Sequence, residues 1–174
     1  KLIVAVGDPD KRFSEDALRM MRAIRFASRL GFQIEMETLK AISEKAELLE
    51  KISKERVKEE LIKIIGSAYP SDGIKLLIST GLMKYIVPEF LEGKNVVQGG
   101  HHHFAVMEHA LESLANCPSP NPLVRFAAMI HDIGKPRSQR YKCRKCGKMY
   151  RDLPDEVHKC AGCGSVQPTR EMIT

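Results

Sequence analysis

Two pairs of closely spaced cysteines constrain the fold of this chain most. Cys143 and Cys146 form one C-x-x-C pair, and Cys160 and Cys163 form another after thirteen residues. A glycine directly follows each pair. Four thiolates complete a tetrahedral zinc shell and leave no position for water, so we expect a structural Zn²⁺ rather than a catalytic one. The segment is too short and polar to bury a core, so the metal would have to organise it.

Other interpretations of the cysteines remain open. They could be four unliganded thiols or a redox pair, although two matched C-x-x-C pairs argue against both. His158 could replace one cysteine as ligand, but we expect it to lie on the surface.

Composition limits the possible classes of protein. The chain has 174 residues, enough for one medium or two small domains, and 43% of them are hydrophobic, which can build a buried core. A net charge of +6 suits a polyanionic partner such as RNA, although many proteins without one carry as much. There is no signal-peptide pattern and no apolar run that could span a membrane. We therefore expect a cytoplasmic protein with no membrane partner.

The periodicity predicts an all-α fold. Ser14 is expected to cap a helix that runs to Leu30 and ends at Gly31. Further helices are expected at about 37–49, 53–65, 74–79, 104–115 and 122–133, with a loop at 70–73. A polar, glycine-containing stretch at 94–100 is the expected domain boundary.

The first of these helices carries an arginine stripe. Arg22, Arg25 and Arg29 fall in one arc, with Arg19 beside it, and apolar residues occupy the opposite side. Asp16 and Arg19, one helical turn apart, could pair a carboxylate and a guanidinium with the Watson–Crick edge of a base. The same spacing is also typical of ordinary surface ion pairs.

A second candidate metal site combines histidine and aspartate. His131 and Asp132 are adjacent at the end of an apolar helix, and His109 lies one helix earlier. Two imidazoles and a carboxylate suit a divalent metal that activates water for phosphate-ester hydrolysis. Alternatively, these side chains merely cap and pack. His101, His102 and His103 are expected in an entry loop, where His103 could line the site.

Residues 127–136, AAMIHDIGKP, together with the upstream helical histidine resemble the HD phosphohydrolase domain. The resemblance implies that His109, His131 and Asp132 hold a divalent metal, with a further aspartate on a later helix. Asp152 and Asp155 lie in the cysteine segment and are poor substitutes. We therefore expect an incomplete HD site.

The stretch from Asp8 to Phe26, the LGF at 30–32 and the SKERV that begins at Ser53 resemble the neck of the bacterial tRNA nucleotidyltransferase and poly(A) polymerase family. Residues 81–89 resemble the body segment that follows. The resemblance implies that Asp16 and Arg19 select CTP or ATP and that Arg22 assists with the triphosphate or the motif's geometry. Arg56 is expected to brace the first helix.

Together the resemblances imply a neck and body at 1–93 and a partial HD domain at 94–174, with a zinc-knuckle insertion at about 140–167. They imply tRNA as partner and the addition of CCA or A to its 3′ end. The family's catalytic head, whose paired carboxylates hold two Mg²⁺ ions, is not found in this sequence. Residues before Asp8 are expected to be its last strand, so we expect no nucleotide transfer by this fragment alone.

Two other functions are compatible with the sequence. The chain could be a stand-alone HD phosphohydrolase that acts on nucleotides or cyclic phosphates. It could also be a non-enzymatic RNA-binding module whose basic zinc knuckle contacts nucleic acid through Arg140, Lys142, Arg144, Lys145 and Lys148.

Overall fold

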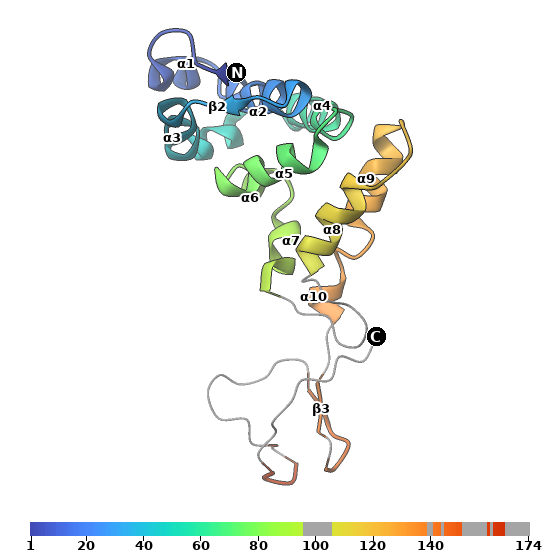
Figure 1. The fold of residues 1–174 in the computed structure, drawn as a ribbon. Helices are drawn as coiled ribbons and strands as arrows, with labels where there is room; N and C mark the ends of the chain where they lie inside the picture. The colour runs from blue at the N-terminus through green and yellow to red at the C-terminus, as the bar shows by residue number, and fades with distance from the viewer. Residues whose placement is uncertain (96–105, 139–140, 144, 151–159, 161, 166–174) are drawn as a thin grey trace.

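The computed structural model describes residues 1–95, 106–138, 141–143, 145–150, 160 and 162–165. Helices dominate these residues, and their strands form two pairs of two residues each. The predicted all-α class is therefore confirmed in its coarse form. Figure 1 shows the first helices at one end of the molecule and the cysteine-bearing hairpin at the other. Within the described residues, every helix is too short or too polar to cross a bilayer.

The N-terminal half is a set of packed helices beside a short parallel strand pair. Strand β1 (Leu2–Ile3) pairs with β2 (Gln33–Ile34), with Leu2 opposite Gln33. The helices are α1 (Pro9–Glu15), α2 (Leu18–Leu30), α3 (Met36–Glu44), the 3₁₀ helix η1 (Ala46–Lys51) and α4 (Lys54–Ile65).

The remaining helices continue from this group toward the hairpin. They are α5 (Pro70–Ser79), α6 (Met83–Ile86), α7 (Pro88–Leu91), the 3₁₀ helix η2 (Glu92–Asn95), α8 (Val106–Ala115), α9 (Pro122–Ile130) and α10 (Lys135–Ser138). Strands β3 (Tyr141–Lys142) and β4 (Met149–Tyr150) form an antiparallel pair. The expected boundary at 94–100 falls largely outside the described residues.

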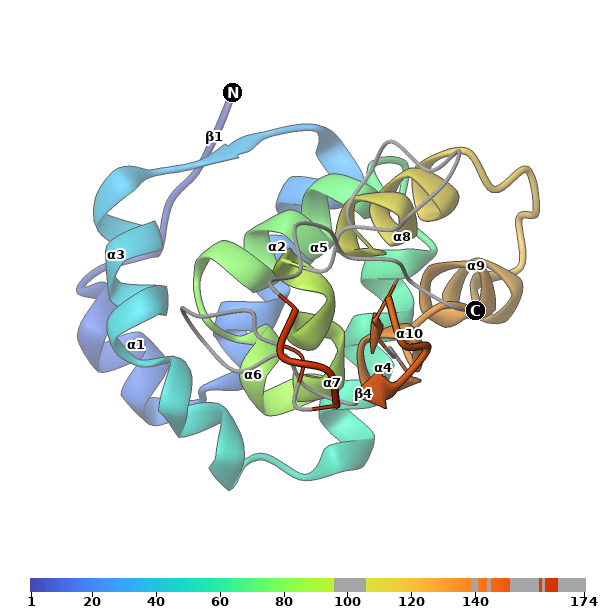
Figure 2. The same cartoon turned by 90° about the horizontal axis from the view of Figure 1, so that it is seen from below.

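Helix α2 lies at the centre of the core. Figure 2 shows α2 and α5 in the middle, with α1 and α3 on one side and α8 and α9 on the other. Met20, Met21 and Ile24 of α2 are fully buried, as are Ile64 of α4 and Leu77 of α5. Buried side chains of α8 and α9, Leu114 and Met129, belong to the same cluster. A single core therefore runs through both halves of the helical region.

The start of the arginine-bearing helix differs from the sequence prediction. Two helices replace the expected single one, because the chain is extended at Asp16. Asp8, whose carboxylate accepts from two backbone N–H groups, caps α1, and Pro9 occupies its first position. Ser14 instead lies inside α1 and donates to the carbonyl of Asp10. The predicted end was correct: Gly31 has a φ of +65° and donates to Ala27 O at 2.9 Å.

The predicted loop at 70–73 is wrong, because these residues form the first turn of α5. Pro70 takes the first helical position, where its missing N–H costs nothing. Gly73 lies where two neighbouring side chains leave no room for a larger residue. A Cβ there would lie 2.5 Å from Cγ2 of Ile64 and 2.9 Å from Cβ of Ser28. The expected helices at 37–49 and 122–133 also end early, at Glu44 and Ile130.

A buried charge joins α2 to α4. The Glu60 side chain is only 4% exposed, and Nη1 of Arg25 lies 3.2 Å and 3.1 Å from its two carboxylate oxygens. Nζ of Lys63 donates to the same carboxylate at 3.1 Å. Arg22 and Arg29 are exposed, as the stripe predicts, whereas Arg25 is only partly exposed and turns toward α4. Two cations therefore offset the cost of burying one carboxylate.

A second arginine joins the two halves of the helical region. Arg125 in α9 donates to the carbonyls of Ser119 at 2.8 Å, Ile65 at 3.4 Å and Ser67 at 3.1 Å. The last two carbonyls lie at the C-terminal end of α4, where a cation also favours the helix dipole. Arg125 thereby fixes the start of α9 against the end of α4.

Replacing Gly73 tests the close approach of α5 to its neighbours. Gly73→Ala should lower the free energy of unfolding by about 1–3 kcal/mol, because the added methyl overpacks Ile64 and Ser28. Urea denaturation would measure this change. Gly134→Ala is the matched control, since no atom lies within 4 Å of the added Cβ. Equal stability of the two variants would contradict the packing described here.

Candidate functional sites

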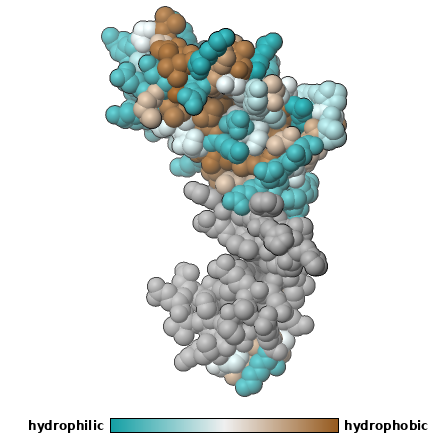
Figure 3. Space-filling view, in the orientation of Figure 1, coloured by the Kyte–Doolittle hydropathy of each residue, from teal (hydrophilic) through white to brown (hydrophobic). Residues whose placement is uncertain are grey.

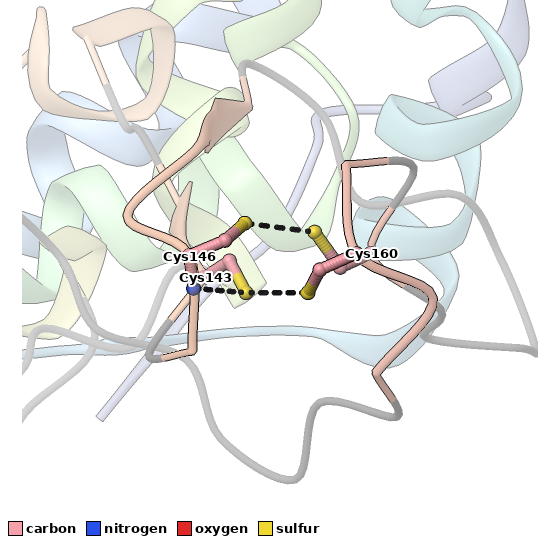
Figure 4. Close-up of side chains that lie close together, drawn as sticks. Cys143, Cys146 and Cys160 are labelled. Carbon is pink, nitrogen blue, oxygen red and sulfur yellow. Dashed lines mark hydrogen bonds between the residues drawn. The ribbon is translucent and has the colours of Figure 1, made fainter.

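The four paired cysteines come together at one point. Sγ of Cys143 lies 3.7 Å from Sγ of Cys163, and Sγ of Cys146 lies 3.5 Å from Sγ of Cys160 (Figure 4). All four sulfurs lie within 4.8 Å of one another. A tetrahedron with Zn–S bonds of about 2.3 Å has edges of about 3.8 Å. The sulfurs are thus spaced for one ion and too far apart for disulfides.

The two C-x-x-C turns repeat the same backbone geometry. In the first, Gly147 has a φ of +74° and its N–H donates to Cys143 O at 2.8 Å. In the second, Gly164 has a φ of +66° and its N–H donates to Cys160 O at 2.7 Å. These positive φ values explain why glycine follows each pair.

Hydrogen bonds and charge at the sulfurs favour a bound cation. A backbone N–H, from Cys146, donates to Sγ of Cys143 at 3.4 Å and is the main cause that lowers the pKa of that thiol. At Cys146 the N–H of Lys148 lowers the pKa, but the sulfurs of Cys160 and Cys143 outweigh it and raise the pKa to about 12. Four thiolates cannot form this close together without a cation between them. The donor set therefore fits a zinc ion.

The predicted histidine–aspartate cluster also forms. Nε2 of His131 lies 3.3 Å from Oδ2 of Asp132, and Nε2 of His109 lies 3.8 Å from the same oxygen. The two imidazole rings meet edge to face, with centroids 5.2 Å apart. The turn after α9 presents His131 and Asp132, and α8 presents His109. All three ligand atoms lie within 4.8 Å of one another, which fits a divalent metal with two nitrogen ligands and one oxygen ligand.

Two further contacts orient this cluster. Nδ1 of His131 lies 2.8 Å from the carbonyl of Ala128, which can only accept, so this nitrogen carries the proton and Nε2 is left as the ligand atom. Nζ of Lys135 lies 2.7 Å from Oδ2 of Asp132. The sequence reasoning missed Lys135, although its position three residues after Asp132 was a signal for an ion pair.

Asp16 occupies the extended residue between α1 and α2, rather than a helical turn. Its Oδ1 accepts from the backbone N–H of Leu18 at 3.1 Å, and its Oδ2 lies 3.2 Å from Nη2 of Arg56 on α4. The side chain is 24% exposed. The expected bracing role of Arg56 therefore has a direct contact in the structure.

Arg19 and Arg22 project from the first turns of α2. Arg19 donates to the carboxylate of Glu15 and to the carbonyl of Arg12 at 3.0 Å. The hydrogen bond from Arg19, together with the charge of Arg12, holds the pKa of Glu15 below its usual value. Arg22 is exposed. Arg19 thus follows Asp16 by three residues, but its ion pair is with Glu15.

Several residues named from the sequence fall outside the described part of the chain. They are His101, His102, His103, Arg140, Arg144, Asp152, Asp155 and His158. Arg25, Glu60 and Arg125 were missed as structural anchors, because nothing local in the sequence pairs residues 35 to 60 positions apart.

Parts of the chain are similar to known proteins. Residues 31–93 match the family model described as a probable RNA and SrmB- binding site of polymerase A. A CCA-adding enzyme from Levilactobacillus brevis is 53% identical over 92 residues, which are 53% of this chain and 23% of that protein. An A-adding tRNA nucleotidyltransferase from Deinococcus radiodurans is 38% identical over 132 residues, covering 71% of this chain and 30% of that protein.

A solved structure shares the fold as well. The Bacillus stearothermophilus CCA-adding enzyme in complex with CTP matches with a TM-score of 0.55 and 34% identity, over 76% of this chain and 31% of that one. By class, the chain is therefore a helical segment whose sequence and fold resemble part of RNA nucleotidyltransferases. More particularly, the matched segments are similar to bacterial tRNA nucleotidyltransferases, and the chain spans about a quarter of the length of the curated relatives.

Proposed function

We propose that this chain supplies the base-selecting and RNA-binding helices of a template-independent RNA nucleotidyltransferase that adds CCA or A to the 3′ end of tRNA. The observation that carries the proposal is the carboxylate of Asp16, which is fixed at the α1–α2 break by Leu18 and Arg56 and remains partly exposed. Asp16 and Arg19 would read the base of CTP or ATP, and Arg22 would contact the triphosphate. The named activities of the matched relatives support this assignment.

The proposed division is a neck and body at 1–93 and a partial HD domain at 94–174. Nucleotide transfer itself would require a head domain that holds Mg²⁺. The surface of this chain around β1 supports a contact with such a domain. Four apolar side chains there are more than half exposed: Leu2, Val4, Val6 and Met36. Figure 3 shows hydrophobic side chains gathered on this N-terminal end of the molecule. Such an apolar surface is typical of a contact with further protein.

Nucleotide incorporation tests the proposed base selection. The assay uses a protein in which this chain follows a nucleotidyltransferase head, with tRNA that lacks its CCA end and labelled CTP or ATP. Asp16→Ala and Arg19→Ala should each lower incorporation by about 100-fold, because the base loses its hydrogen-bonding partners. Lys40→Ala, which changes an exposed side chain of α3, is the control. Full incorporation by Asp16→Ala would contradict the proposed base selection.

Arg56 should act through Asp16 rather than through folding. The Arg56 side chain is 48% exposed, so Arg56→Met should change the free energy of unfolding by less than about 1 kcal/mol. Base selection should nevertheless relax, visible as a changed ratio of CTP to ATP incorporation, and Arg56→Lys should restore part of it. An unchanged ratio in Arg56→Met would show that the ion pair has no positioning role.

The cysteine cluster would hold a structural Zn²⁺ in an insertion at about 140–167. Zinc content by mass spectrometry should be about one ion per chain, because four thiolates saturate one ion. Cys160→Ser should lose this zinc, and Cys117→Ser, which changes the cysteine outside the cluster, should keep it. Retention of zinc by Cys160→Ser would contradict the site.

A second candidate function is metal-dependent phosphohydrolysis at the HD-like cluster, favoured by the convergence of His109, His131 and Asp132. There Asp132 and the two imidazoles would hold the ion, which supplies an activated water when bound. Mn²⁺ titration by calorimetry should detect a site that His131→Ala weakens by at least tenfold. Glu112→Ala, an exposed change on the same α8, should leave it intact. Equal Mn²⁺ affinity in both variants would exclude the cluster as a metal site.

A further inference from the structure

A groove lined with cations lies where the C-terminal halves of α2 and α4 meet the loop before α9. Arg25 and Arg29 of α2 and Lys63 of α4 supply the charge. No carboxylate is among the residues that line it. The other lining residues are small or apolar: Ile62, Gly66, Ser67, Ala68, Pro120 and Pro122.

The charge of this groove is only partly neutralised. Glu60 lies buried between Arg25 and Lys63 and offsets one of these two charges. Glu59 lies 3.9 Å from Lys63 but is 70% exposed, so solvent weakens this pair. Arg29 is exposed and forms no ion pair with another described residue. The groove therefore keeps a positive excess that faces solvent.

The C-terminal end of α4 would ordinarily repel an anion bound in the groove, because the last carbonyls of a helix carry partial negative charge. In this chain the guanidinium of Arg125 donates to the carbonyls of Ile65 and Ser67. This contact covers the negative helix end with a cation. The groove is thus made favourable for anions by two elements that are distant in sequence.

The groove is distinct from the base-selecting end of α2. Arg19 lies in the first turn of α2 and Arg29 in the last, and ten residues of helix separate them by about 15 Å. A strand bound in the groove would need only a few nucleotides to reach the base-selecting end.

We propose that this groove binds the phosphate backbone of an RNA strand, with Arg29 and Lys63 as its principal contacts. The choice of RNA rests on the proposed function. It also rests on the family match, because five of the nine lining residues fall inside the segment 31–93 described as RNA-binding. Guanidinium and ammonium groups are suited to phosphate oxygens.

The 174-residue chain and a fluorescent RNA hairpin with a single-stranded 3′ tail test the proposal. Arg29→Glu should weaken binding at least about fivefold and reduce the slope of log K against log salt by about one, since one phosphate contact is lost. Lys40→Glu makes the same change of charge at a side chain that is 75% exposed on α3, and should bind nearly as wild type. Thermal unfolding would confirm that both variants are folded.

The outcomes separate this groove from the proposed function. If Arg29→Glu binds RNA as tightly as Lys40→Glu does, the groove proposal is overturned. The proposed function would still stand, because nucleotide incorporation by the head-containing protein tests it separately. If the wild-type chain fails to bind the hairpin, the groove proposal also fails. Poly-glutamate of matched charge that binds as tightly as RNA, with the same sensitivity to Arg29→Glu, would assign the groove to acidic protein instead.

Discussion

The contact between α2 and α4 is the constraint on which the rest of the structure depends. Its apolar part buries Ile24, Leu61 and Ile64, and its polar part is the carboxylate of Glu60 between Arg25 and Lys63. Removing Arg25 would leave this buried carboxylate with the half-exposed Lys63 as its remaining cation, at a cost in stability. This contact also determines where the other helices can lie, since α5 packs into the space that Gly73 leaves open and α9 is tied to the end of α4.

The two candidate metal clusters differ in what they need from the fold. Each cysteine turn is a local structure of a few residues, so its sulfurs are positioned by glycine geometry and by neighbouring N–H groups. His109 and Asp132, in contrast, come from α8 and from the turn after α9, and depend on how those helices pack. The first cluster would organise its surroundings, whereas the second uses a framework built by the hydrophobic core.

Short-range patterns predicted much of this arrangement. The spacing of the cysteines, the end of α2 at Gly31 and the outward position of Arg22 all follow from local chemistry. The break at Asp16 did not, because Ser14 also has the features of a helix cap, whereas the cap that forms, Asp8 followed by Pro9, lies six residues earlier. Likewise Pro70 to Gly73 looked like a loop, because only the nearness of Ile64 and Ser28 explains a glycine inside a helix.

Contacts between residues far apart in the chain could not be predicted from the sequence for the same reason. Two of the three carbonyls that accept from Arg125 lie about 60 residues away, and the ion pair of Glu60 with Arg25 spans 35 residues. The identity of such partners is decided by helix packing rather than by spacing. The resemblance to a family implied roles for Asp16 and Arg19, but the ion pair of Asp16 with Arg56 is seen only in the folded structure.

That ion pair has a consequence for how a base would be recognised. Both oxygens of Asp16 already have donors, one from Leu18 and one from Arg56, so the carboxylate is held in one rotamer before any base arrives. A base amino group would meet an acceptor that is already oriented. The entropy cost of fixing that side chain would therefore not weaken binding. It would also have to share the carboxylate with a guanidinium. Such sharing would keep any one base from being held too tightly, which suits the proposed selection of one nucleotide after another.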